Sequence, residues 1–270
     1  MNQTTASPIK ITLLFLLFFA IIVVMPMIPS PQLGHTTIGN ILAPIVLLLL
    51  TRYVYQKEGK NLSALGLTLK KNTITYFPMG VIVGILFFSL LLLSQAYQNG
   101  LSITPNPNAN VFLILGGFLF LIISVLNEEL IFRGYCFQQT LYHVGVTRAN
   151  IIFAFLFIVY HWIALHAWGN WAAMLGLFTT GFGHFLFATA FLKSRTLYFP
   201  IGIHLGNNWA QRYLFSANMG GINNNPSNDT FFILNSSLQE SSLSLTIFNY
   251  VVSILCFLSV TWTIWKWTKN

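Results

Sequence analysis

Charged side chains are scarce in this sequence: they make up 7% of its 270 residues, and only five residues are acidic. Soluble domains carry roughly 25% charged residues. Hydrophobic residues account for 55% of the chain and gather in long apolar runs. This combination excludes an ordinary water-soluble domain and indicates an all-α polytopic membrane protein.

Several signatures of common enzymes are also missing. The sequence has no His-Glu-x-x-His motif, which excludes a zinc protease of that type, and no phosphate-binding glycine loop. Without a Gly-x-Ser-x-Gly elbow, a nucleophilic enzyme has little support. The two cysteines, Cys136 and Cys256, lie in or beside apolar runs without metal-ligand spacing, so we interpret them as packing residues. The net charge of +8 does not indicate nucleic-acid binding, because the basic residues are spread over short loops.

Eight apolar segments are long enough to cross a membrane as helices. Seven of them cover residues 9–29, 37–55, 77–96, 150–167, 171–192, 197–215 and 243–265. The other, which is the fourth in chain order, runs from residue 111 to the adjacent carboxylates Glu128 and Glu129. We interpret the first as an uncleaved helix rather than a signal peptide, because only Lys10 flanks it and no small-residue cleavage site follows. Residues 134–149 are expected to form a short interfacial segment. The whole chain, 1–270, is expected to form a single membrane domain.

The basic residues indicate the orientation of these segments. Basic residues concentrate in the cytoplasmic loops of membrane proteins. With the N-terminus in the cytoplasm, Arg212 is the only one of the thirteen basic residues that falls outside. We therefore expect both termini in the cytoplasm and a multi-pass protein of the inner (plasma) membrane.

Two adjacent carboxylates end the fourth apolar segment, where an ionised group costs on the order of 2.5 kcal/mol or more. Glu129 and Arg133 are four residues apart, so they share a helix face and can pair. Glu128 lies about 100° around the helix, where Arg133 satisfies it less well. The spacing predicts one neutralised, structural carboxylate and one that is free for chemistry.

Two further segments carry polar residues inside the apolar runs. His161 lies in the fifth segment, and His204 and Asn208, which share a helix face, lie in the seventh. Asn207 competes with Asn208 but is turned about 100° away. Carboxylate, imidazole and carboxamide groups at a similar depth, toward the cytoplasmic side, would form either a zinc site with an open position or a metal-free site that activates water.

Each of these features also has a simpler interpretation. Buried carboxylates in membrane helices serve as proton or ion relays, and a lone intramembrane histidine often only bonds a neighbouring helix. Two alternatives to an enzyme therefore stay open: an ion-coupled transporter that uses Glu128 and Glu129, and a non-catalytic immunity or scaffold protein. His184 has no partner at helical spacing and is interpreted as structural.

Three motifs in order resemble a known family. Glu128-Glu129-x-x-x-Arg133, Phe157-x-x-x-His161 and His204-x-x-x-Asn208 are similar to the signature of the CPBP intramembrane proteases, the CAAX-protease and bacteriocin-processing (Abi) group. The resemblance covers residues 60–215, which would form the catalytic core.

The resemblance implies hydrolysis of a peptide bond near or within the membrane. Glu128 and His161 would activate the attacking water, and His204 and Asn208 would stabilise the oxyanion or help to hold a metal. Glu129 and Arg133 would complete and brace the site. If a metal is used, zinc would lie on Glu128, His161 and His204; metal-dependent and metal-free chemistry both stay open. Membrane lipid and a hydrophobic or prenylated peptide or membrane protein are the expected partners, and nucleic acid is not.

Overall fold

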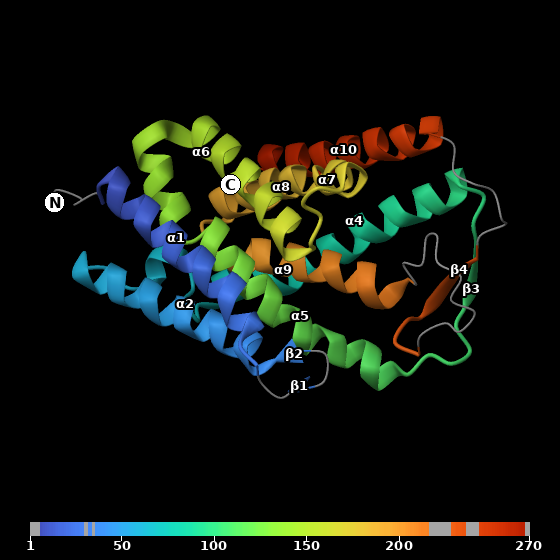
Figure 1. Cartoon of the computed structure of the whole chain (residues 1–270), viewed down its shortest axis with the longest axis horizontal. Coiled ribbons are helices and arrows are strands. Elements are labelled where there is room, and N and C mark those ends of the chain that lie inside the picture. The colour runs from blue at the N-terminus through green and yellow to red at the C-terminus, as the bar shows by residue number, and fades with distance from the viewer. Residues whose placement is uncertain (1–5, 30–31, 34–35, 216–227, 236–242, 268–270) are drawn as a thin grey trace.

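The computed structural model describes residues 6–29, 32–33, 36–215, 228–235 and 243–267. Helices make up most of this part of the chain, as the sequence predicted (Figure 1). The helices are α1 (Pro8–Val24), α2 (Ile38–Lys57), α3 (Lys71–Ile74), α4 (Tyr76–Gln98), α5 (Val111–Phe132), α6 (Tyr135–Ala164), α7 (Trp171–Leu177), α8 (Thr180–Ser194), α9 (Tyr198–Trp209) and α10 (Leu243–Lys266).

Four short strands accompany the helices within the described ranges. They are β1 (Gln32–Leu33), β2 (Thr36–Thr37), β3 (Ser102–Pro105) and β4 (Phe232–Asn235). β1 pairs antiparallel with β2, and β3 pairs antiparallel with β4 so that Ile103 faces Leu234. The second sheet connects the link before α5 to the link before α10, and Asn110 extends this contact by donating its backbone N–H to the Asn228 carbonyl.

Six helical segments of the described chain are long and apolar enough to cross a membrane. One of them, Val111–Ala164, has 54 residues and contains both α5 and α6. The predicted seventh span does not qualify as one long α-helix, because α9 has 12 residues and passes into a π-helical turn at Ala210–Leu214. The predicted sixth span corresponds to the candidate span Trp171–Ser194, which consists of α7 and α8. A polytopic helical membrane protein is therefore supported, whereas eight crossings and the orientation stay predictions.

The chain reverses direction within α6. α5 ends at Phe132, and α6 begins after Gly134. At Gly145 the backbone has φ 79° and ψ 170°, a conformation open essentially only to glycine. The segment predicted as interfacial, 134–149, is thus helical on both sides of one sharp turn, and α6 folds back on itself (Figure 1). At about 1.5 Å per residue, the returning limb is long enough to bring His161 back beside Glu128.

Helices α4 and α9 pack unusually closely, because each carries two glycines four residues apart. These are Gly80 and Gly84 in α4, and Gly202 and Gly206 in α9. A Cβ atom on Gly84 would overlap the backbone carbonyl of Ile203, and one on Gly206 would overlap that of Val81. Small residues at this spacing let two membrane helices approach backbone to backbone. The contact fixes α9, and with it His204, against α4.

Replacing Gly206 by alanine is expected to lower the stability of the protein. The added methyl group would push α9 away from the Val81 carbonyl, and overpacking of this kind costs typically about 1–3 kcal/mol. The measurement is the thermal unfolding midpoint of the purified protein in detergent. Gly116→Ala in α5 is the matched control, because its Cβ would meet nothing within 4 Å. Equal midpoints for the two variants would contradict the close packing.

Candidate active site

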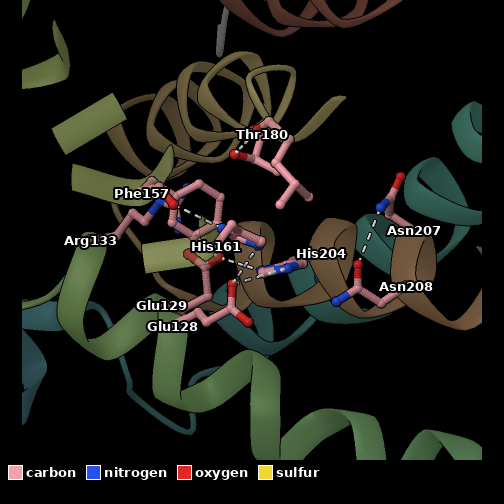
Figure 2. A network of polar contacts seen from close by, with 10 residues as sticks. Glu128, Glu129, Arg133, Phe157, His161, Thr180, His204, Asn207 and Asn208 are labelled. Atoms are coloured by element: carbon pink, nitrogen blue, oxygen red, sulfur yellow. Dashed lines mark hydrogen bonds and ion pairs between the residues drawn. The ribbon is translucent and has the colours of Figure 1, made fainter. Parts of the chain in front are cut away.

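Three helices bring the predicted polar residues to one place (Figure 2). Glu128 and Glu129 lie near the end of α5, His161 lies near the end of α6, and His204 lies in the middle of α9. Arg133 follows α5 directly. Glu129 and Arg133 are fully buried, and Glu128 and His204 are 6% and 4% exposed. Ionisable groups buried this completely among apolar helices need partners, and Glu129, Arg133 and His204 supply them to one another.

Glu129 is the centre of the buried contacts. Its Oε1 accepts a hydrogen bond from Arg133 Nη1 at 3.2 Å and a second from His204 Nδ1 at 2.8 Å. The predicted pairing of Glu129 with Arg133 is therefore present. The guanidinium carbon of Arg133 also lies 4.7 Å from the ring centroid of Phe157 and 5.0 Å from that of Phe187, within the range of cation–π attraction. The positive charge of Arg133 is thus stabilised by one carboxylate and two aromatic rings.

Glu128 is held much less tightly. Its Oε2 has no hydrogen-bond partner among the described residues. Two imidazole nitrogens face this oxygen: Nε2 of His204 at 3.7 Å and Nε2 of His161 at 3.9 Å. Both distances are too long for a direct hydrogen bond. Oε2 of Glu129 likewise has no hydrogen-bond partner in the described part of the chain, but Glu129 is paired through its Oε1, as the helix geometry predicted, so Glu128 is the less tightly held of the two carboxylates.

Hydrogen bonds fix which nitrogen of each histidine faces Glu128. Nδ1 of His161 lies 2.8 Å from the backbone carbonyl of Phe157, which can only accept, so this nitrogen carries the proton. Nδ1 of His204 is likewise held by the Glu129 carboxylate. In the neutral forms, both Nε2 atoms then present lone pairs toward Glu128. Three proton-accepting atoms therefore converge on one small volume, which suits a water molecule or another donor of protons.

The donor atoms are also of the types that zinc takes, and each Nδ1 has the orienting partner usual for a metal-bound imidazole. However, the described residues contain no group of three or more His, Cys, Asp or Glu side chains placed to hold a metal ion. Oε2 of Glu128 and the two Nε2 atoms fit a metal in chemistry but not in arrangement.

Asn208 lies apart from the carboxylates. It is one helical turn beyond His204, and its Oδ1 accepts a hydrogen bond from Nδ2 of Asn207 at 3.3 Å. Figure 2 shows both asparagines on the side of His204 that faces away from Glu129 and Arg133. The predicted role of Asn208 is thus not supported by a direct contact with the carboxylates among the described residues, and it stays a prediction.

Two aromatic side chains contact the histidines of the site, and only one of them belongs to a motif found in the sequence. The ring of Phe187, from α8, stacks on His204 with centroids 4.5 Å apart. The ring of Phe157 contacts His161 at 4.5 Å. Phe157 belongs to the second motif, but nothing in the sequence distinguishes Phe187 from the other phenylalanines. His184 is fully buried among aromatic rings, including Phe137 at 5.6 Å, which agrees with a structural interpretation.

The protein is helical, has several candidate membrane spans and carries a buried cluster of two carboxylates, two histidines and one arginine. These features define the class of polytopic membrane proteins with an intramembrane polar site. Residues 110–210 match the family described as "Type II CAAX prenyl endopeptidase Rce1-like". This match supports the CPBP/CAAX protease family and an intramembrane endopeptidase of the CAAX type. The matched segment includes α5 to α9 and all of the site residues described above. The comparisons found no matching curated protein and no matching solved structure.

Proposed function

We propose that this protein hydrolyses a peptide bond of a membrane-associated peptide or protein, with water activated by Glu128 and His161. One observation carries the proposal: the Nε2 atoms of His161 and His204 lie 3.9 Å and 3.7 Å from Oε2 of Glu128, which has no hydrogen-bond partner among the described residues. A water molecule there donates one proton to Glu128 and is oriented by His161. Loss of that proton to the carboxylate makes the water oxygen a nucleophile toward a peptide carbonyl.

His204 and its partners complete the proposed reaction. When His204 carries a proton on both nitrogens, its Nε2–H can donate to the oxygen of the tetrahedral intermediate, while Glu129 offsets the charge through Nδ1. Arg133 in turn holds Glu129 in place. Asn208, one turn along α9, is proposed to offer a second donor to the oxyanion. Glu128 then returns its proton to the leaving amine, so that one water and one peptide bond give a carboxylic acid and an amine, and the acid's proton passes to the amine to leave a carboxylate and an ammonium group.

The proposed substrate is a hydrophobic or prenylated chain end that reaches the site along the membrane. The description of the matching family names CAAX prenyl endopeptidases, and this chain resembles them over the segment that holds the site. The prediction that both termini are cytoplasmic puts the end of α5, and hence Glu128, near the cytoplasmic face. We therefore propose a plasma-membrane protease whose site is reached from that side, within a catalytic core of residues 60–215.

The proposed function is tested with the purified full chain in detergent and a peptide that ends in a farnesylated Cys-aliphatic-aliphatic-X sequence. Mass spectrometry is expected to show loss of the last three residues, with oxygen from labelled water in the new carboxylate. His161→Gln and His204→Gln are expected to reduce the rate by about 10²–10⁴-fold. The same substitution at His166, an exposed residue outside the site, is the control. Cleavage that is insensitive to both site variants would contradict the proposal.

Removal of metal ions is expected to leave this activity unchanged, because the proposed reaction uses only side chains of the chain itself. The measurement is the cleavage rate after extended dialysis against a chelator, compared with the rate after dialysis against buffer. A loss of activity that zinc alone restores would show that Glu128, His161 and His204 rearrange to bind the metal, and would replace the general-base mechanism.

A further inference from the structure

A groove lies between α1 and α2, on the side of α1 away from the candidate active site. Its volume is about 470 Å³. Most of its wall is apolar and is formed by Leu13, Leu14 and Leu17 of α1 and by Val54 of α2. The opposite face of α1 packs inward through Phe15, whose ring meets those of Phe132 and Phe153. The groove is therefore a surface feature that the proposed hydrolysis does not use.

One end of the groove is cationic. Lys10, in the first turn of α1, and Lys57, in the last turn of α2, line the groove where the two helices end side by side (Figure 1). Nζ of Lys57 lies 5.5 Å from the ring centroid of Tyr53, and it has no ion-pair partner in the described part of the chain. Tyr53 is 56% exposed and also lines the groove.

Glu58, the one carboxylate that the described residues place at this end, does not neutralise the lysines. Glu58 lies 3.2 Å from Nζ of Lys10 and 3.6 Å from Nζ of Lys60, and it also accepts a hydrogen bond from the Tyr135 hydroxyl. Its side chain is 6% exposed, so it is covered by these partners. Three lysines against one carboxylate leave a positive charge of about two at the mouth of an apolar groove.

We propose that this groove binds one anionic phospholipid, with its phosphate between Lys10 and Lys57 and an acyl chain along Leu13, Leu14 and Leu17. Basic pockets between membrane helices near the membrane surface bind anionic head groups in this way. An exposed tyrosine beside the lysines is typical of the same depth, the interface between head groups and acyl chains. The complementary charge selects an anionic over a zwitterionic head group, and the apolar wall selects a lipid over a soluble phosphate.

The test uses the full chain in dodecylmaltoside, titrated with dioleoylphosphatidylglycerol or with dioleoylphosphatidylcholine, and native mass spectrometry to count retained lipids. The wild-type protein is expected to retain one phosphatidylglycerol in preference to phosphatidylcholine. Each lysine near a membrane surface contributes about 1 kcal/mol, which is roughly five-fold in affinity. Lys57→Gln is therefore expected to weaken phosphatidylglycerol binding about five-fold, and Lys10→Gln/Lys57→Gln about 30-fold.

Two comparisons keep this result specific to the groove. Lys70→Gln/Lys71→Gln removes the same charge from exposed residues outside the groove, so it is expected to leave the affinity unchanged. Lys57→Gln alone preserves the ion pair of Lys10 with Glu58. Weaker lipid binding by this variant is therefore not caused by local unfolding at this end of the groove. The proposal is overturned if the wild type retains both lipids equally, if the control variant loses as much affinity as the groove variant, or if millimolar inorganic phosphate displaces the lipid.

Discussion

Replacing Glu128 by glutamine is expected to lower the rate of peptide hydrolysis by about 10³-fold or more while leaving the protein folded. The amide has nearly the same shape as the carboxylate but cannot accept a proton from water, so the proposed general base is lost. Stability should change little, because Oε2 of Glu128 has no hydrogen-bond partner among the described residues. The measurement is the turnover of the farnesylated peptide at saturating concentration, together with the thermal unfolding midpoint of the same preparation.

Two further variants make this result specific to Glu128. Glu128→Asp retains a carboxylate at a greater distance from the two Nε2 atoms, and its rate is expected to lie between those of the wild type and of Glu128→Gln. Glu58→Gln makes the same chemical change at the C-cap of α2, outside the site. Because it also removes the ion pair with Lys10, its cleavage rate is compared per folded protein and is expected to equal that of the wild type. If Glu128→Gln turned over peptide at the wild-type rate, Glu128 would have no part in the chemistry. The transporter and scaffold functions would then be the alternatives to test.

Replacing Arg133 by leucine is expected to destabilise the protein by about 3–5 kcal/mol, the largest loss of stability that we predict. The substitution removes one partner of a fully buried ion pair and leaves the Glu129 carboxylate in an apolar interior with only His204 to bond it. The guanidinium also loses its contacts with the rings of Phe157 and Phe187. Thermal unfolding in detergent, followed by circular dichroism, measures the effect.

Arg212, which also has a carboxylate partner among the described residues, is the matched control. Arg212 lies 3.6 Å from Asp229, but the arginine side chain is 61% exposed, so Arg212→Leu is expected to cost less than about 1 kcal/mol. Similar losses at Arg133 and Arg212 would show that the buried pair does not carry the predicted energy.

Removing both charges separates stability from function. In Glu129→Leu/Arg133→Leu the Glu129 carboxylate is removed together with its partner, so this double variant is expected to regain part of the stability that Arg133→Leu loses. It should nevertheless stay inactive, because Nδ1 of His204 no longer has a carboxylate to orient it. An active double variant would mean that the contact of Glu129 with His204 is not needed for the reaction.

The sequence by itself determined the features that depend on local geometry. Its composition defined a helical membrane protein, and helical periodicity placed Glu129 and Arg133 on one face, where they form their ion pair. The same periodicity separated Glu128 from that pair. The three motifs predicted that residues on α5, α6 and α9 meet, because their order is similar to that of a known family.

Only the tertiary structure decided how these residues meet. The turn at Gly145 returns His161 to Glu128, and the close contact of α4 with α9 sets the position from which His204 reaches Glu129. The stacking of Phe187 on His204 depends on the packing of α8 against α9. These contacts join residues far apart in the chain, and helical spacing relates only residues three or four positions apart. The physical reason is therefore the range of the interaction: short-range pairs can be predicted from spacing, whereas long-range contacts depend on how whole helices pack.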